Sequence, residues 1–162
     1  MKRLVVVAAA VAAIAALVFP VAALASTTQV SAFGCQNHGG QANVPADRDV
    51  VVRQALVFKN LGLTQNYLHA QTSSLSVNGA AAADVSGLWV APFATSGAWQ
   101  TTLLYPTGIT LAAGQSMTFH LVVSLSHPSV DGLSFENGVS GKPVFFGPGP
   151  TFDLGVCTVT GV

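Results

Sequence analysis

The stretch MTFHLVVSLS, residues 117–126, has the clearest alternation of apolar and polar side chains in the chain. One face of a strand here would hold Met117, Phe119, Leu121, Val123 and Leu125. The other face would hold Thr118, His120, Val122, Ser124 and Ser126. A two-residue period is typical of a strand with one face in a core and the other toward solvent. We therefore expect a half-buried antiparallel strand.

Further strands are predicted on both sides of this stretch. The run VVVRQALVF, residues 50–58, is rich in β-branched residues and indicates a largely buried strand. Weaker strands are expected at 67–77, 88–93, 99–105, 144–146 and 155–160, with short pieces near 29–33. Turn signals separate them at 60–62, 78–79, 106–108, 113–114, 131–132 and 137–138, and the two prolines of 147–150 indicate a loop or an edge crossing.

Helical signals are scarce. Only residues 79–85, with four consecutive alanines, favour a helix, and so short a segment forms at most one turn. Without long helices as crossovers, the strands are expected to pair mainly antiparallel. The sequence thus predicts an all-β fold, an antiparallel immunoglobulin-like β-sandwich of about seven or eight strands.

Two segments carry a resemblance to a known class of domain. Residues 57–62, VFKNLG, and 109–121, ITLAAGQSMTFHL, resemble a strand, turn and strand pattern of bacterial extracellular immunoglobulin-like modules. The resemblance covers roughly residues 50 to 125. A cysteine near each end is also similar to the family 2 carbohydrate-binding modules, although that family presents a row of exposed tryptophans, commonly three, and this chain has only Trp89 and Trp99. The resemblance implies the sandwich fold more than a ligand.

The N-terminus has the pattern of a cleavable secretory signal peptide. Lys2 and Arg3 precede an apolar stretch to about Phe19, and Ala23-Leu24-Ala25 fits a cleavage site. A membrane anchor is the competing interpretation, because residues 4–25 are just long enough to span a bilayer. We expect a signal peptide at 1–25, one β-sandwich domain at 26–162, secretion, and no membrane attachment after cleavage.

The charge content excludes some classes of partner. Only 7% of the 162 residues are charged, and 51% are hydrophobic. Nucleic-acid binding needs clustered basic residues that this chain lacks, and disorder is disfavoured because the apolar content is sufficient for a core.

The two cysteines, Cys35 and Cys157, lie near opposite ends of the expected domain. An exported chain with an even number of cysteines usually oxidises them, so we expect a structural disulfide between these two residues.

Catalytic and metal-binding signals are weak. Asp131 and Glu136 are the best acidic pair for a hydrolase, but acids in turn-rich segments usually face solvent. His69 and His120 are weak metal candidates, because no closely spaced pair of ligands occurs in the sequence. We expect no enzyme activity and no cofactor, and keep a metal-binding protein or a hydrolase as minor alternatives.

Two binding roles remain. Sparse charge on strand edges favours association, so the expected function is a structural or adhesive module that binds itself or other surface proteins. Residues 26–31 are a candidate donor strand for such assembly, and a disordered leader is the competing interpretation of this segment. The alternative is a carbohydrate-binding module that holds polysaccharide on exposed aromatic rings. Its candidate rings are Trp89, Trp99, Tyr67 and Tyr105.

Overall fold

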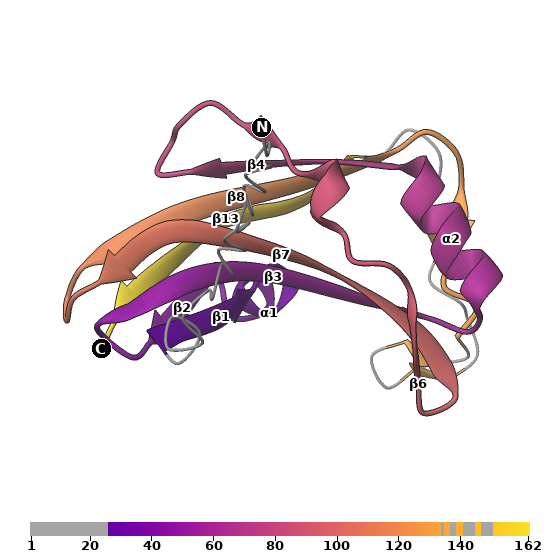
Figure 1. Cartoon of the computed structure of the whole chain (residues 1–162), viewed down its shortest axis with the longest axis horizontal. Coiled ribbons are helices and arrows are strands. Elements are labelled where there is room, and N and C mark those ends of the chain that lie inside the picture. Colours follow the sequence, from indigo (N-terminus) through magenta and orange to yellow (C-terminus); the bar gives the residue numbers. More distant parts are fainter. Residues whose placement is uncertain (1–25, 134, 137–138, 141–144, 147–150) are drawn as a thin grey trace, which may run out of the picture.

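The computed structural model describes residues 26–133, 135–136, 139–140, 145–146 and 151–162 (Figure 1). The expected signal peptide at 1–25, the expected turn at 137–138 and the expected loop at 147–150 lie outside these residues, as does Val144.

Two mixed β-sheets form two layers (Figure 1). The four-stranded sheet has the order β1 (Thr27–Ser31), β3 (Arg48–Phe58), β7 (Ala98–Leu111) and β6 (Phe93–Thr95). The five-stranded sheet has the order β2 (Gln41–Val44), β13 (Thr151–Gly161), β8 (Ser116–Leu125), β4 (Gln71–Val77) and β5 (Ala83–Asp84). Two-residue strands form two further pairs, β9 (Ser129–Val130) with β12 (Phe145–Phe146) and β10 (Phe135–Glu136) with β11 (Val139–Ser140).

The strands pair mainly antiparallel, as predicted, but the sheets are mixed and do not form a purely antiparallel sandwich. β1 runs parallel to β3, and β2 runs parallel to β13. A parallel neighbour requires a crossover connection. Between β1 and β3, the short helix α1 (Ala32–Asn37) and β2 supply this crossover by way of the other sheet.

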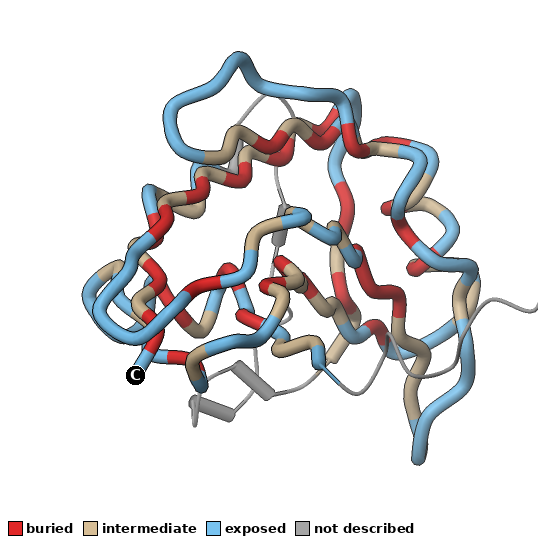
Figure 2. The backbone as a smooth tube through the Cα atoms, turned by 60° about the vertical axis from the view of Figure 1, so that its left-hand side comes forward, coloured by how far each residue is buried: buried red, intermediate tan, exposed pale blue. Residues whose placement is uncertain are grey.

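The alternating stretch that begins at Met117 behaves as predicted. It forms β8, and its five alternate apolar residues from Met117 to Leu125 are all buried. β8 lies between β13 and β4 and pairs antiparallel with both. Opposite it, β3 contributes Val50, Val52 and Phe58, each fully buried. Figure 2 shows such buried positions recurring along the paired strands, with exposed positions concentrated in the connections.

The helix α2 (Leu61–Ala70) replaces the turn expected at 60–62 and the first part of the strand expected at 67–77. Asn60 starts the helix by accepting a hydrogen bond from the Leu63 amide at 3.0 Å. Thr64, Tyr67 and Ala70 recur every three residues and are buried. Helix capping and tertiary packing therefore outweigh the β propensity of Tyr67, and α2 closes one end of the two layers (Figure 1).

The turn expected at 106–108 is also wrong, because β7 runs through it without a break. Pro106 pairs with Val51 next to a shift in register, where a bulge accommodates a residue that cannot donate to the ladder. The Thr107 hydroxyl donates to the Val50 carbonyl at 2.7 Å, and this bond helps to hold the irregular part of the strand pair together.

Three smaller expectations also differ from the structure. The strand expected at 88–93 is replaced by the 3-10 helix η2 (Ser86–Leu88), one bridge between Trp89 and Leu103, and β6. The possible helical turn at 79–85 does not form. The piece near 29–33 is a strand only as far as Ser31, where α1 begins after a Ser31 hydroxyl cap.

Candidate functional site

The candidate aromatic platform is not assembled, because two of its four members lie in the core. Tyr67 is 2% exposed and Trp89 is 8% exposed. Their ring centroids are 5.4 Å apart in an edge-to-face arrangement, and Tyr67 also packs on Phe58. The Trp89 indole donates a hydrogen bond to Ser73 at 3.0 Å. Tyr67 and Trp89 therefore cannot stack on a sugar in this structure, and the corresponding prediction is wrong for both residues.

Trp99 and Tyr105 are half-buried on β7, on the same face as the fully buried Leu103. Trp99 lies opposite Phe58 and Tyr105 lies opposite Val52. Six residues of strand separate these two rings by roughly 20 Å, since a strand rises about 3.3 Å per residue. The two rings therefore do not form one stacking surface.

The two candidate metal ligands lie on different elements. His69 is exposed on α2, and His120 is half-buried on β8. Among the described residues, no group of three or more His, Cys, Asp or Glu side chains is arranged to hold a metal ion. Of the acidic pair, Asp131 is buried, and its carboxylate accepts from the Leu133 amide at 2.9 Å. The side chain of Glu136 lies outside the described part.

His120 has a partner that the sequence did not reveal. Its Nε2 lies 2.5 Å from Oδ1 of Asp153, on the exposed face of the five-stranded sheet. The hydrogen bond from His120, together with the Gly155 amide at 2.8 Å, lowers the pKa of the Asp153 carboxyl below its ordinary value. An irregularity in β13 between Asp153 and Val156 sets this register, and Gly155, which has a positive φ within it, is the sequence signal that could have marked it.

The expected disulfide between Cys35 and Cys157 is present, with Cα atoms 6.0 Å apart. It joins α1 to β13 and thereby connects the segment between β1 and β2 to an inner strand of the five-stranded sheet. Both cysteines are buried. The bond is structural, because neither sulfur is a free thiol.

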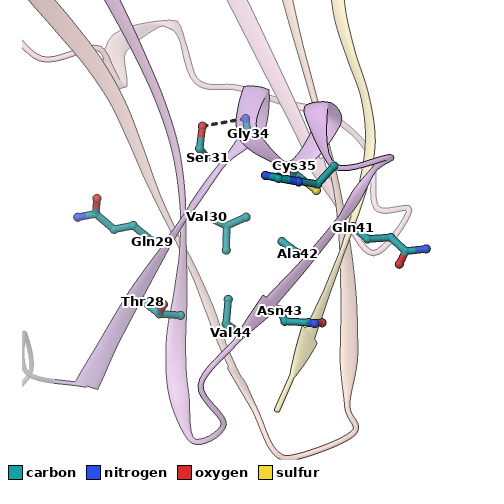
Figure 3. A pocket seen from close by; sticks show the side chains of 11 residues that line it. Thr28, Gln29, Val30, Ser31, Gly34, Cys35, Gln41, Ala42, Asn43 and Val44 are labelled. Atoms are coloured by element: carbon teal, nitrogen blue, oxygen red, sulfur yellow. Dashed lines mark hydrogen bonds between the residues drawn. The ribbon is translucent and has the colours of Figure 1, made fainter.

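A cleft of about 470 Å³ opens beside this disulfide, between the edge strands β1 and β2 (Figure 3). Val30, Ala42 and Val44 point into the space between the two strands, whereas Gln29 and Gln41 point away from it (Figure 3). The complete lining is Thr28, Gln29, Val30, Ser31, Gly34, Cys35, His38, Gln41, Ala42, Asn43 and Val44. No Lys, Arg, Asp or Glu is among these lining residues, so the cleft suits an uncharged ligand.

A second surface lies on the outer face of the four-stranded sheet. Its exposed large apolar side chains are Val57, Val90, Phe93 and Leu104, which we call the apolar patch. Phe93 and Val57 both lie opposite Gln100 of β7, one on each side. Leu104 lies two positions beyond Thr102 on the same face, and the Val90 amide bonds to the Thr102 carbonyl at 2.9 Å.

Polar groups at the centre of the apolar patch are paired with each other. The Gln100 amide donates to the Thr102 hydroxyl at 3.1 Å, and Thr102 is only 6% exposed although it points outward. Because these two side chains bond to each other, removing water from this part of the patch costs less.

Comparisons with models of protein families, with curated proteins and with solved structures find no match for this chain. No helix in the described ranges is long and apolar enough to cross a membrane.

Proposed function

We propose that the protein is a secreted, non-catalytic β-domain that acts by self-association at the cell surface, as a structural or adhesive module. The observation that carries this proposal is the apolar patch on the outer face of the four-stranded sheet. Exposed clusters of large apolar side chains on soluble domains commonly mark interaction surfaces.

A second copy of the chain suits this face for two reasons. The outward-facing strand positions include one cation, Arg53, and one anion, Asp49, so two such faces meet without net repulsion. Two sheets can also stack face to face at about 10 Å with their side chains interdigitating, as inside a β-sandwich. Charge depletion at the centre of the patch is typical of the core of a protein interface.

A carbohydrate-binding role has less support. Its candidate rings are divided between the core and a half-buried strand face, and no flat row of exposed aromatic side chains emerges from them. We therefore place self-association first and polysaccharide binding second.

Light scattering coupled to size-exclusion chromatography tests the proposal. We expect the purified protein to form concentration-dependent dimers or larger species, and the variant V57K/L104K to elute as a monomer. V156K/V162K is the matched control, because Val156 and Val162 lie outside the patch, are 58% and 67% exposed, and their replacement adds the same two charges. A wild-type protein that stays monomeric at millimolar concentration would overturn self-association.

Secretion is tested separately by intact mass. Protein recovered from the medium of an exporting host should have the mass of a chain that begins at Ser26. A product that retains residues 1–25 and stays with the membrane fraction would instead support the anchor.

A further inference from the structure

The two edge strands β1 and β2 are placed differently from the other two edges of the sheets. β1 ends the four-stranded sheet, and β2 ends the five-stranded sheet. They flank the same cleft, and in the described part of the chain no strand pairs with the outer edge of either. An edge strand without a neighbour presents backbone N–H and C=O groups that can accept another strand.

Natural edge strands are usually protected, and the sequences of these two strands lack the common forms of protection. Charged side chains, prolines and bulges are the common protection against unwanted pairing. The sequences of β1, TTQVS, and β2, QANV, contain no charged residue and no proline, and their pairing shows no shift in register. The opposite edges are β6, with three residues, and β5, with two, and they offer less backbone for pairing.

The candidate donor segment, residues 26–31, is not free in this structure. Most of it forms β1, whose five residues all pair with β3, and Val30 is 5% exposed. Exchange of this strand between copies would have to break these contacts first. The segment is therefore not a free donor strand, and the outer side of Thr28–Ser31 is where another strand could be added.

The cleft is held in shape before any ligand arrives. The Ser31 hydroxyl accepts from the Gly34 amide at 3.1 Å and caps α1 directly after β1 (Figure 3). At the other end of α1, the Gly40 amide donates to the Cys35 carbonyl at 2.9 Å, and the Gly40 carbonyl accepts from Thr158 at 2.8 Å. These bonds and the disulfide fix β1 relative to β2. Little conformational entropy would therefore be lost from the site when a ligand binds.

We propose that this cleft binds an extended, uncharged peptide segment of a partner protein by strand addition to β1. About four residues would match Thr28–Ser31 of β1, and small apolar side chains at alternate positions would lie against Ala42, which is half-buried, whereas Val30 and Val44 form the nearly buried floor of the cleft. Backbone hydrogen bonds supply affinity in this mode, and pockets for alternate side chains supply specificity. A charged side chain inside the cleft would bind less well, because it would lose hydration and the lining has no Lys, Arg, Asp or Glu to pair with it. This site is separate from the apolar patch.

A fluorescein-labelled peptide of sequence GTVTVTG is a suitable probe, with binding followed by anisotropy. We expect saturable binding that weakens at least tenfold when alternate amides are N-methylated, or when both valines are replaced by aspartate. Equal affinity for the parent and the N-methylated peptide would overturn strand addition, and so would no binding at millimolar peptide.

Variants of the protein locate the site. Ala42→Trp should fill the cleft and reduce the affinity at least tenfold, whereas Ala113→Trp, at an exposed turn outside the cleft, should leave it unchanged. Because Ala42 is half-buried, Thr28→Lys provides a second test at the same cleft, and circular dichroism checks the fold of each variant. Unchanged affinity in both folded cleft variants would contradict the proposal. V57K/L104K should bind the probe normally, which separates this result from self-association.

Discussion

The indole Nε1 of Trp89 donates to the Ser73 hydroxyl at 3.0 Å inside the core, where Ser73 is fully buried. Because of this bond, the indole N–H is buried between the two sheets without the cost of an unpaired polar group. The same hydroxyl donates to the Gln71 side chain at 2.6 Å, so Ser73 links the indole to a short polar chain within the core. Trp89 is therefore a structural residue.

We expect Trp89→Ala to lower the free energy of unfolding by about 3 to 5 kcal/mol, because it removes a large core side chain. Ser73→Ala should cost about 1 to 3 kcal/mol, since the indole N–H would be buried without a partner. Urea denaturation measures both. Ser73→Ala should lower the free energy of unfolding less in the Trp89→Ala background than in the wild type, because the indole that needs Ser73 is then already absent. A Trp89→Ala variant as stable as the wild type would contradict the placement of the Trp89 ring in the core.

Burial raises the pKa of the Tyr67 phenol above its ordinary value. The neutral form is thus favoured in the folded state, and its contribution to stability is complete below the ordinary tyrosine pKa of about 10. The free energy of unfolding should therefore fall as the pH rises beyond about 10, by at most about 1.4 kcal/mol per pH unit for this one group.

Tyr67→Phe isolates that effect. The variant should lose less stability between pH 9.5 and 11 than the wild type, whatever its stability at neutral pH. The chain has two tyrosines, so absorbance of tyrosinate near 295 nm provides a second measurement. Part of the wild-type signal should rise only with unfolding, and Tyr67→Phe should abolish this delayed step. Identical alkaline slopes in the two proteins would contradict the assignment.

The disulfide joins residues 122 positions apart in the sequence. Closing so long a loop restricts the unfolded chain, and the chain-entropy estimate is about 4 to 5 kcal/mol, an upper figure for most natural bonds. We expect the variant C35A/C157A to lose about 3 to 5 kcal/mol of unfolding free energy in urea. Intact mass of the wild type should lack two hydrogens, and both sulfurs should resist thiol reagents until the protein unfolds. Two reactive thiols in the native protein would refute the bond.

Where the fold follows from the sequence, local pattern and tertiary packing agree. β8 was predictable because every second residue from Met117 to Leu125 is apolar and the sheet buries that face. The disulfide was predictable because two cysteines allow only one intramolecular pairing. In both cases the physical constraint is contained in the residues themselves.

Other parts depend on contacts that a single segment does not contain. Asn60 is equally typical of a turn and of a helix cap. The packing of Tyr67 against Phe58 and Trp89, which the local sequence does not show, favours the helix. Pro106 is typical of a strand break, yet an irregularity in β7 itself, between Pro106 and Thr110, accommodates it. The cleft could not be foreseen, because it needs β1 and β2 to be edges of different sheets that meet at one side.

The exposed pair of His120 and Asp153 gives a further test. Hydrogen bonds from His120 and from the Gly155 amide lower the pKa of the Asp153 carboxyl below the usual value of about 3.9. His120→Val should raise this pKa only part of the way toward that value, because the Gly155 bond remains. Carbon-detected NMR titration of the carboxyl groups measures the change.

Asp84 is the internal control for that titration. Its pKa is lowered by the Ser86 hydroxyl and amide, so His120→Val should leave it unchanged. A lowered pKa in the folded state means that the contribution to stability is present above the unfolded value and is lost as the pH falls through the folded one. Any effect on unfolding should therefore appear only below about pH 4, and it should be small because solvent screens the exposed Asp153. If the midpoint of Asp153 does not move in His120→Val, the pair does not form in solution.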